Sequence, residues 1–115
     1  MSERSALVWL HDARRHALEA HDIAQGLSDD AFNRSRRDQL AVQFCLAVVG
    51  EALNEIPKDV QALAPDIPWR ATYNLRNRLI HGFWLIDTEI VLDIARNSTV
   101  PLVVSIDRLI EALDA

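Results

Sequence analysis

Apolar residues recur through most of the chain at steps of three and four residues, the spacing of one face of an α-helix. From Ser5 to about Leu27 this face consists of Leu7, Leu10, Ala13, Ala17, Ala20 and Ala24. Gly26 favours a stop, and residues 28–30 (SDD) supply capping side chains for a new helical start near Ala31. A second main helix is predicted over residues 34–56, where the middle is apolar on nearly every side, as in the centre of a bundle.

The helical pattern continues in shorter pieces after Pro57, which cannot extend the second helix. We expect one turn over residues 59–64, a helix Trp69–His81 ended by Gly82, a helix from Asp87 or Thr88 to about Ala95, a break at residues 97–99 and a last helix to Leu113. The one β-rich stretch, residues 100–106, contains Pro101. The prediction is a single all-α domain over residues 1–115, an up-and-down bundle of four to six helices.

Composition and charge narrow the class of protein. The 115 residues are 50% apolar and 25% charged, which excludes disordered and collagen-like chains. The net charge of −5 argues against a protein that coats nucleic acid non-specifically, because that binding requires many neutralised phosphates. Residues 69–81, however, contain three arginines and no acid, whereas residues 82–115 contain six acids and two arginines. A small phosphate-binding site therefore remains compatible with the acidic balance.

Cys45 and the most apolar segment bear on the cell compartment. A single cysteine cannot form an internal disulfide, and Cys45 lies in an apolar run, so we expect a buried thiol in a reducing cytoplasm. No signal peptide is indicated at the N-terminus. The most apolar segment, residues 40–53, has 14 residues and is too short to span a bilayer. We expect a cytoplasmic protein without a membrane partner.

Two charged residues occupy apolar helix faces. On a helical wheel, Arg76 falls within the apolar arc of the helix Trp69–His81, and Glu51 shares the face of Phe44 and Val48 in the preceding main helix. An unpaired buried charge is very costly, so we predict that Glu51 and Arg76 lie close together. Such a pair could fix helix packing or could hold Arg76 for function.

His81 is the candidate for proton transfer. It lies five residues after Arg76, in the final turn before Gly82, so both side chains can reach one volume at the end of the helix. Histidine moves protons near neutral pH and arginine stabilises charge on phosphoryl oxygens, as RNA cleavage by the RNA's own 2′-hydroxyl requires. The other histidines, His11, His16 and His21, are spaced by five and are interpreted as solvated helix positions. We predict no metal and no cofactor, since no metal-ligand spacing or glycine-rich phosphate loop occurs.

Other arginines are candidate RNA contacts. Arg70 and Arg78 belong to the acid-free helix and are the more suggestive pair. The densest basic run, Arg34, Arg36 and Arg37, is either a solvated stretch near a helix start or a contact for RNA or a partner. The preference for arginine over lysine suits phosphate binding, although a GC-rich genome produces the same bias.

The segment Arg76–His81 (RNRLIH) resembles the RNxxxH form of the Arg-x(4–6)-His motif of HEPN-domain ribonucleases. Residues 50–52 (GEA), 67–70 (IPWR) and 86–87 (ID) resemble the HepT toxin branch of that family, and the similarity covers nearly the whole chain. The resemblance implies a toxin of a toxin–antitoxin system: an all-α homodimer whose two motifs line a shared cleft and cleave RNA without metal. It also implies a minimal nucleotidyltransferase (MNT) antitoxin as partner.

Carried over residue by residue, the resemblance makes Arg76 and His81 the catalytic pair, Asn77 a polar support and Glu51 a partner that holds Arg76. The HepT motif continues as His-x-Tyr, and the antitoxin adenylylates that tyrosine. Here Phe83 occupies the position and has no hydroxyl to accept a nucleotide. An alternative function is therefore a non-catalytic HEPN-type dimer that binds a nucleotidyltransferase, nucleotide or RNA.

Overall fold

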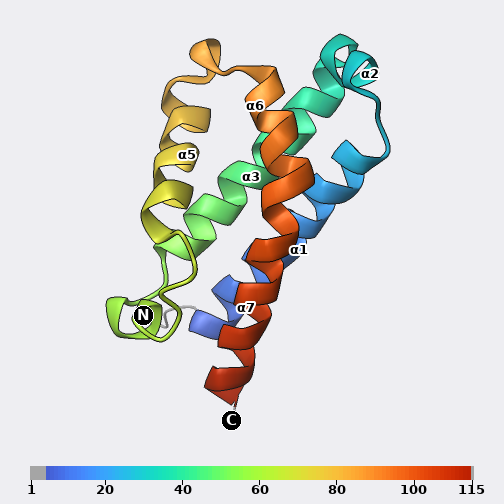
Figure 1. The fold of residues 1–115 in the computed structure, drawn as a ribbon. Helices are drawn as coiled ribbons and strands as arrows, with labels where there is room; N and C mark the ends of the chain where they lie inside the picture. The colour runs from blue at the N-terminus through green and yellow to red at the C-terminus, as the bar shows by residue number, and fades with distance from the viewer. Residues whose placement is uncertain (1–4, 115) are drawn as a thin grey trace.

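The computed structural model describes residues 5–114, and its secondary structure is helical throughout (Figure 1). The elements are α1 (Ala6–Gln25), α2 (Asp29–Arg34), α3 (Arg36–Asn54), α4 (Lys58–Gln61), α5 (Trp69–His81), the 3₁₀ turn η1 (Phe83–Leu85), α6 (Thr88–Asp93), the π-helical turn η2 (Ile94–Ser98) and α7 (Thr99–Asp114). No strand occurs among the described residues. The predicted all-α class is confirmed.

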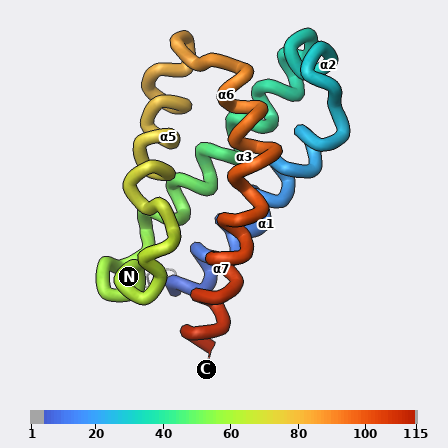
Figure 2. The backbone as a smooth tube through the Cα atoms, in the orientation of Figure 1, coloured from blue at the N-terminus to red at the C-terminus, as the bar shows by residue number. Residues whose placement is uncertain are grey.

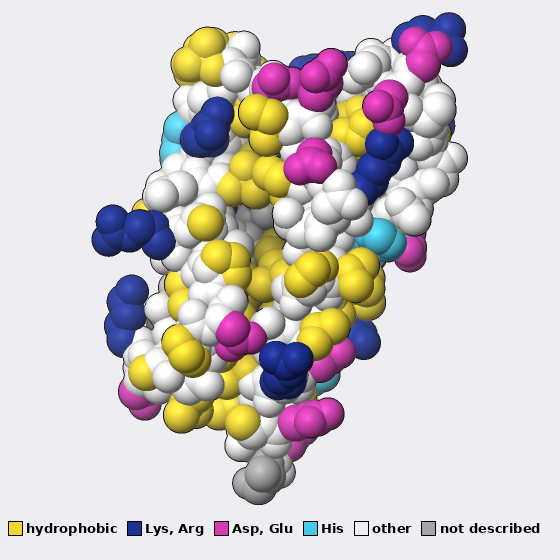
Figure 3. Space-filling model, viewed as in Figure 1, with side chains coloured by type: hydrophobic (Ala, Val, Ile, Leu, Met, Phe, Trp, Pro, Cys, Tyr) yellow, Lys and Arg dark blue, Asp and Glu magenta, His cyan; other side chains and the backbone are white. Residues whose placement is uncertain are grey.

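The long helices run up and down, with α1, α3 and α7 packed together and α5 at one edge of the bundle (Figures 1 and 2). α5 packs mainly on α3. Between α5 and α7 lies an apolar hollow of about 80 Å³, with Val49 and Gly50 of α3 among its lining residues. Figure 3 shows hydrophobic side chains along this hollow. The position of α5 therefore depends chiefly on its contact with α3.

Small side chains allow α1 to approach its neighbours closely. Ala13, Ala17, Ala20 and Ala24 are all fully buried, as the three- and four-residue spacing predicts. Ser5 caps the start of α1 by accepting a hydrogen bond from the backbone N–H of Val8, and Gly26 follows its last residue. No helix among the described residues is long and apolar enough to cross a membrane.

Two predicted boundaries are wrong. The helix predicted over residues 34–56 is divided at Ser35, whose hydroxyl accepts a hydrogen bond from the backbone N–H of Asp38 and so starts α3. The break predicted at residues 97–99 is instead the π-helical turn η2, through which α6 runs on into α7. Within this continuous helical path, the hydroxyl of Thr99 donates to the carbonyl of Ala95 one turn earlier at 2.7 Å.

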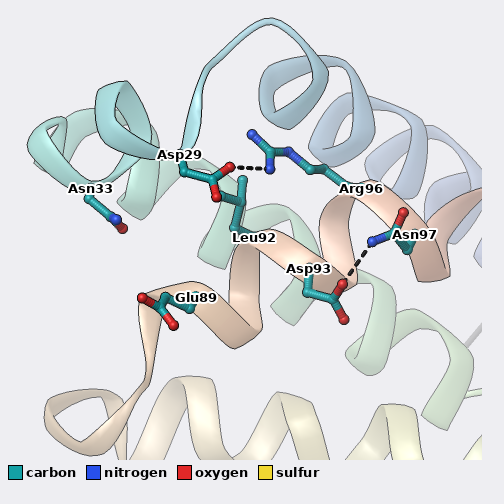
Figure 4. Close-up of a pocket in the computed structure, with 7 residues that line it drawn as sticks. All are labelled: Asp29, Asn33, Glu89, Leu92, Asp93, Arg96 and Asn97. Carbon is teal, nitrogen blue, oxygen red and sulfur yellow. Dashed lines mark hydrogen bonds and ion pairs between the residues drawn. The ribbon is translucent and has the colours of Figure 1, made fainter.

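Arg96, in η2, forms hydrogen bonds and an ion pair with the end of α1 and the start of α2 (Figure 4). Its guanidinium donates to the carbonyl of Ala24 at 3.4 Å and to that of Leu27 at 2.6 Å, and it pairs with Asp29 at the start of α2. Leu27 lies after α1, and Arg96 gives its carbonyl a charged donor; the Ala24 carbonyl, which already accepts from the N–H of Leu27, gains a second donor. Its side chain is 25% exposed.

We expect Arg96→Ala to lower the free energy of unfolding by about 2 kcal/mol, because it removes the charged donor of the Leu27 carbonyl and the ion pair with Asp29. Urea denaturation followed by circular dichroism measures the change. Arg34→Ala is the matched control, since Arg34 pairs with Asp30 in an exposed salt bridge, and it should change stability by less than about 0.5 kcal/mol. Equal effects of the two substitutions would contradict the role assigned to Arg96.

Candidate active site

The helices α3 and α5 meet at Gly50, which has no side chain to separate them. A Cβ atom built on Gly50 would lie 2.5 Å from the Cβ of Arg76 and 2.6 Å from the carbonyl oxygen of Thr72. Both distances are far below van der Waals contact, so any larger residue would push α5 away from α3. Gly50 therefore sets the distance at which Arg76 lies against α3.

Arg76 forms an ion pair with Glu51, the residue after Gly50. Its Nη2 lies 2.6 Å from Oε2 of Glu51, and its Nη1 donates to Oδ1 of Asn77 at 2.8 Å. The predicted proximity of Glu51 and Arg76 is confirmed. The two side chains are 23% exposed for Arg76 and 39% exposed for Glu51, so the pair lies at the margin of the helix contact.

The guanidinium of Arg76 is oriented from two sides and still has unused donors. Of its five N–H groups, one on Nη2 is directed to Glu51 and one on Nη1 to Asn77. The Nε atom is buried and has no hydrogen-bond partner among the described residues. One N–H on each Nη remains available for an anion such as a phosphate.

His81 is the last residue of α5, and its side chain is exposed. The helix ends as predicted at Gly82, whose backbone N–H donates to the carbonyl of Arg78 at 2.9 Å. Five residues of ideal helix place the Cα atoms of Arg76 and His81 roughly 8–9 Å apart. The exposed imidazole therefore lies one and a half turns beyond an oriented guanidinium, on the same helix.

Arg70 and Arg78 are both exposed on α5, and neither forms an ion pair with another described residue. Figure 3 shows basic side chains along the edge occupied by α5 and acidic ones gathered near α2 and α6. In the basic run around the start of α3, Arg34, Arg36 and Arg37 are all exposed, and Arg34 pairs with Asp30. The charge asymmetry predicted from the sequence is present on the surface.

Two of the three histidines interpreted from the sequence as solvated, His16 and His21, are instead partly buried. Of the three histidines in α1, His11 alone is exposed. The Nδ1 of His16 lies 2.8 Å from the carbonyl oxygen of Asp12, and its ring contacts Phe44 edge to face. His21 is also partly buried, with Nδ1 3.3 Å from the carbonyl oxygen of Ala95. The contacts of His16 with Phe44 and of His21 with Ala95 join α1 to other elements, so the spacing within α1 could not predict them.

Cys45 is buried as expected, 5% exposed, with its thiol 3.8 Å from Oε2 of Glu19. Burial and then the Glu19 carboxylate raise the pKa of this thiol to about 11. Very little thiolate exists at neutral pH, so Cys45 is not a nucleophile. Among residues 5–114, no three His, Cys, Asp or Glu side chains come together as metal ligands do. Of the carboxylates in Figure 4, Asp29 pairs with Arg96 and Asp93 accepts from the side chain of Asn97.

The apolar arc predicted for α5 is only partly buried. Leu79 is buried, but Tyr73 is 37% and Ile80 43% exposed. Ile80 instead lines a groove between α5 and α3 together with Arg36, Leu40, Gln43, Phe44, Ala47, Leu79 and Phe83. Phe44 is 65% exposed in this groove. Helical periodicity predicted that these positions belong to an apolar face. It could not show that the other described elements leave that face uncovered.

The sequence comparisons find that this chain is similar to ribonucleases. The family model "Ribonuclease HepT-like" matches residues 13–109. The chain is 28% identical over 114 residues to the "Putative RNase MJ0127" of Methanocaldococcus jannaschii, covering 99% of this chain and 94% of that protein. It is 29% identical over 89 residues to the "Probable ribonuclease HepT" of Thermococcus cleftensis, covering 77% and 81%. No solved structure shows a significant match.

The fold and site thus define an all-α ribonuclease with an arginine and a histidine on one helix. The chain belongs to the HepT-like ribonuclease family. The family resemblance that the motif Arg76–His81 predicted is confirmed.

We expect Gly50→Ala to lower the free energy of unfolding by about 2 kcal/mol, because the added methyl overpacks the contact between α3 and α5. Chemical denaturation measures the loss. Gly26→Ala is the matched control: its φ is −78°, and the nearest atom to an added Cβ is 3.6 Å away. That substitution should be neutral or stabilising by up to about 1 kcal/mol. A Gly50→Ala protein as stable as wild type would show that the contact relaxes without cost.

Proposed function

We propose that the protein is a metal-independent endoribonuclease in which Arg76 binds the scissile phosphate and His81 transfers protons. The observation that carries this proposal is the oriented guanidinium of Arg76, held by Glu51 and Asn77 with unused N–H donors, on the helix that ends at His81. Preorganised donors stabilise the charge that develops on phosphoryl oxygens in the transition state. Arg70 and Arg78 would bind flanking phosphates of the same RNA.

The chemistry is an internal transfer within the RNA. The 2′-hydroxyl loses its proton to an imidazole and attacks the adjacent phosphorus, and the bond to the 5′-oxygen of the next nucleotide breaks. The leaving oxygen takes a proton, so the products are a 2′,3′-cyclic phosphate and a 5′-hydroxyl. The step needs a base and an acid, and each chain supplies one His81 at the end of α5. A two-fold dimer would supply both.

We expect His81→Ala and Arg76→Ala each to reduce the cleavage rate of single-stranded RNA by at least about a hundredfold in EDTA, because each removes a proton-transfer or charge-stabilising group. Gel analysis of end-labelled RNA measures the rate, and mapping of product ends tests for a 2′,3′-cyclic phosphate. His11→Ala is the matched control, since His11 is also exposed but lies on α1, and it should retain wild-type activity.

Equal RNA loss with wild type and both variants would mean a contaminating nuclease and would exclude the proposed activity for this chain. Product ends without cyclic phosphate would exclude attack by the 2′-hydroxyl. Expression in a bacterial host gives a second readout: growth arrest that His81→Ala relieves supports a toxin. A protein that binds RNA without cleaving it would correspond to the non-catalytic alternative.

We propose that a second copy of the chain covers the groove between α3 and α5. The exposed side chains of Leu40, Phe44 and Ile80 line it, and Phe83, two residues beyond His81, lines its end. Apolar surface of this kind is stabilised by burial against a partner. A two-fold contact here would bring the two copies of α5 near each other and place both Arg76–His81 pairs in one cleft.

We expect Phe44→Glu to convert a dimer into a monomer at micromolar concentration, because it places a charge in the centre of this apolar groove. Sedimentation velocity measures the oligomeric state. Leu63→Glu is the matched control: Leu63 is 62% exposed but lies near α4, outside the groove, and the variant should remain dimeric. A Phe44→Glu protein that stays dimeric would place the interface elsewhere.

We propose further that the protein acts in the cytoplasm as the toxin of a toxin–antitoxin system, with an MNT-type nucleotidyltransferase as antitoxin. Membership in the HepT-like family and the exposed His81 on the helix that carries Arg76 support this role. Phe83 stands where the resemblance places a modified tyrosine, so inhibition would not proceed through adenylylation at this position. The antitoxin would act by occupying the cleft.

A further inference from the structure

The turn that follows His81 exposes three consecutive large apolar side chains. Phe83 is 56%, Trp84 68% and Leu85 75% exposed, and together they form the 3₁₀ turn η1. Trp84 and Leu85 do not line the groove between α3 and α5, whereas Phe83 does. Trp84 is therefore an exposed indole beside the site, outside the groove that we assign to a second copy.

The two aromatic rings of η1 hold each other at a fixed angle. The ring centroids of Phe83 and Trp84 are 5.1 Å apart and the ring planes meet at 82°, edge to face. In such a pair the contact covers at most one face of either ring, so each ring keeps at least one face free of the other. Because Trp84 is 68% exposed, its indole is accessible to a planar ligand.

Backbone hydrogen bonds anchor the turn at both ends. The N–H of Leu85 donates to the carbonyl of Gly82 at 2.9 Å, and that of Ile86 to the carbonyl of Phe83 at 3.3 Å. Asp87 then caps α6 by accepting from the N–H of Glu89. The indole is thus presented from a short, hydrogen-bonded segment between two helices.

We propose that Trp84 is a base-stacking site for the RNA nucleotide next to the scissile phosphate. This inference rests on the proposed ribonuclease function, which brings a phosphate to Arg76 and His81. Trp84 follows His81 by three residues, so their Cα atoms are no more than roughly 11 Å apart, within the span of one or two nucleotides. Aromatic side chains beside a phosphate-binding site are the usual receptors for unpaired bases.

A stacking site at Trp84 determines the kind of RNA that is cleaved. A base must leave its helical stack to lie on the indole, so the site selects single-stranded over double-stranded RNA. Stacking tolerates all four bases, because each base has a π face. The exposed Arg78, three residues before His81 on α5, supplies positive charge for the backbone of that strand.

We expect Trp84→Ala to raise KM for a short single-stranded RNA by roughly tenfold, the usual order of effect for one stacked base, with kcat little changed. Trp84→Phe should restore most of the affinity, because the aromatic face is retained. Leu85→Ala is the matched control: it truncates the more exposed neighbour in the same turn and should leave KM unchanged. An unchanged KM for Trp84→Ala would overturn the proposal.

A binding measurement without cleavage separates this inference from the proposed activity. In His81→Ala protein, a single-stranded RNA should quench tryptophan fluorescence, and an abasic oligomer of equal charge should not. The quench should disappear in the His81→Ala, Trp84→Phe double variant, in which the partly buried Trp9 and Trp69 remain.

The outcomes are distinct. If RNA quenches the fluorescence but the wild-type protein never cleaves RNA, the proposed stacking site is supported and the proposed nuclease activity is contradicted. If cleavage depends on His81 but the quenching does not depend on bases, the proposed nuclease activity is supported and the proposed stacking site is contradicted. Dissociation of Trp84→Ala into monomers, measured by sedimentation, would show that Trp84 contacts a second copy and would overturn the proposal.

Discussion

The close contact between α3 and α5 at Gly50 is the constraint on which the site depends. α5 packs mainly on α3, and an apolar hollow separates it from α7. Because Gly50 has no side chain, the backbone of α5 approaches until the Cβ of Arg76 lies 2.5 Å from where a Cβ of residue 50 would be. Only at that distance does the guanidinium reach Glu51, which is attached to the next Cα of α3.

The remainder of the bundle provides a rigid support for this contact. Alanines of α1 such as Ala13 and Ala17 are fully buried and let α1 lie close to its neighbours. As a result, α1 packs closely against α3 and supports it. At the far end, Arg96 joins the end of α1, the start of α2 and η2 through one guanidinium. Two arginines thus perform opposite tasks: Arg96 uses its donors on the protein, whereas Arg76 keeps some of them free.

Much of this arrangement was predictable from the sequence because it is local. The bounds of α5 follow from Pro68 and Gly82, and helical periodicity identified Glu51 and Arg76 as charges on apolar faces that had to meet. Features that depend on how two helices cross were not predictable: the contact at Gly50, the interhelical partners of His16 and the exposure of Ile80. The π-helical turn was missed because residues 97–99 also suit a helix start, and packing decided between the two.

The ion pair between Glu51 and Arg76 has a consequence for which anions can enter the site. At rest, the guanidinium already has a carboxylate as its counter-ion at 2.6 Å. A free phosphate ion would have to share or displace that carboxylate, whereas the RNA of the proposed activity would be bound at several phosphates at once. Under that proposal, the carboxylate of Glu51 would favour a polynucleotide over small phosphorylated metabolites at Arg76.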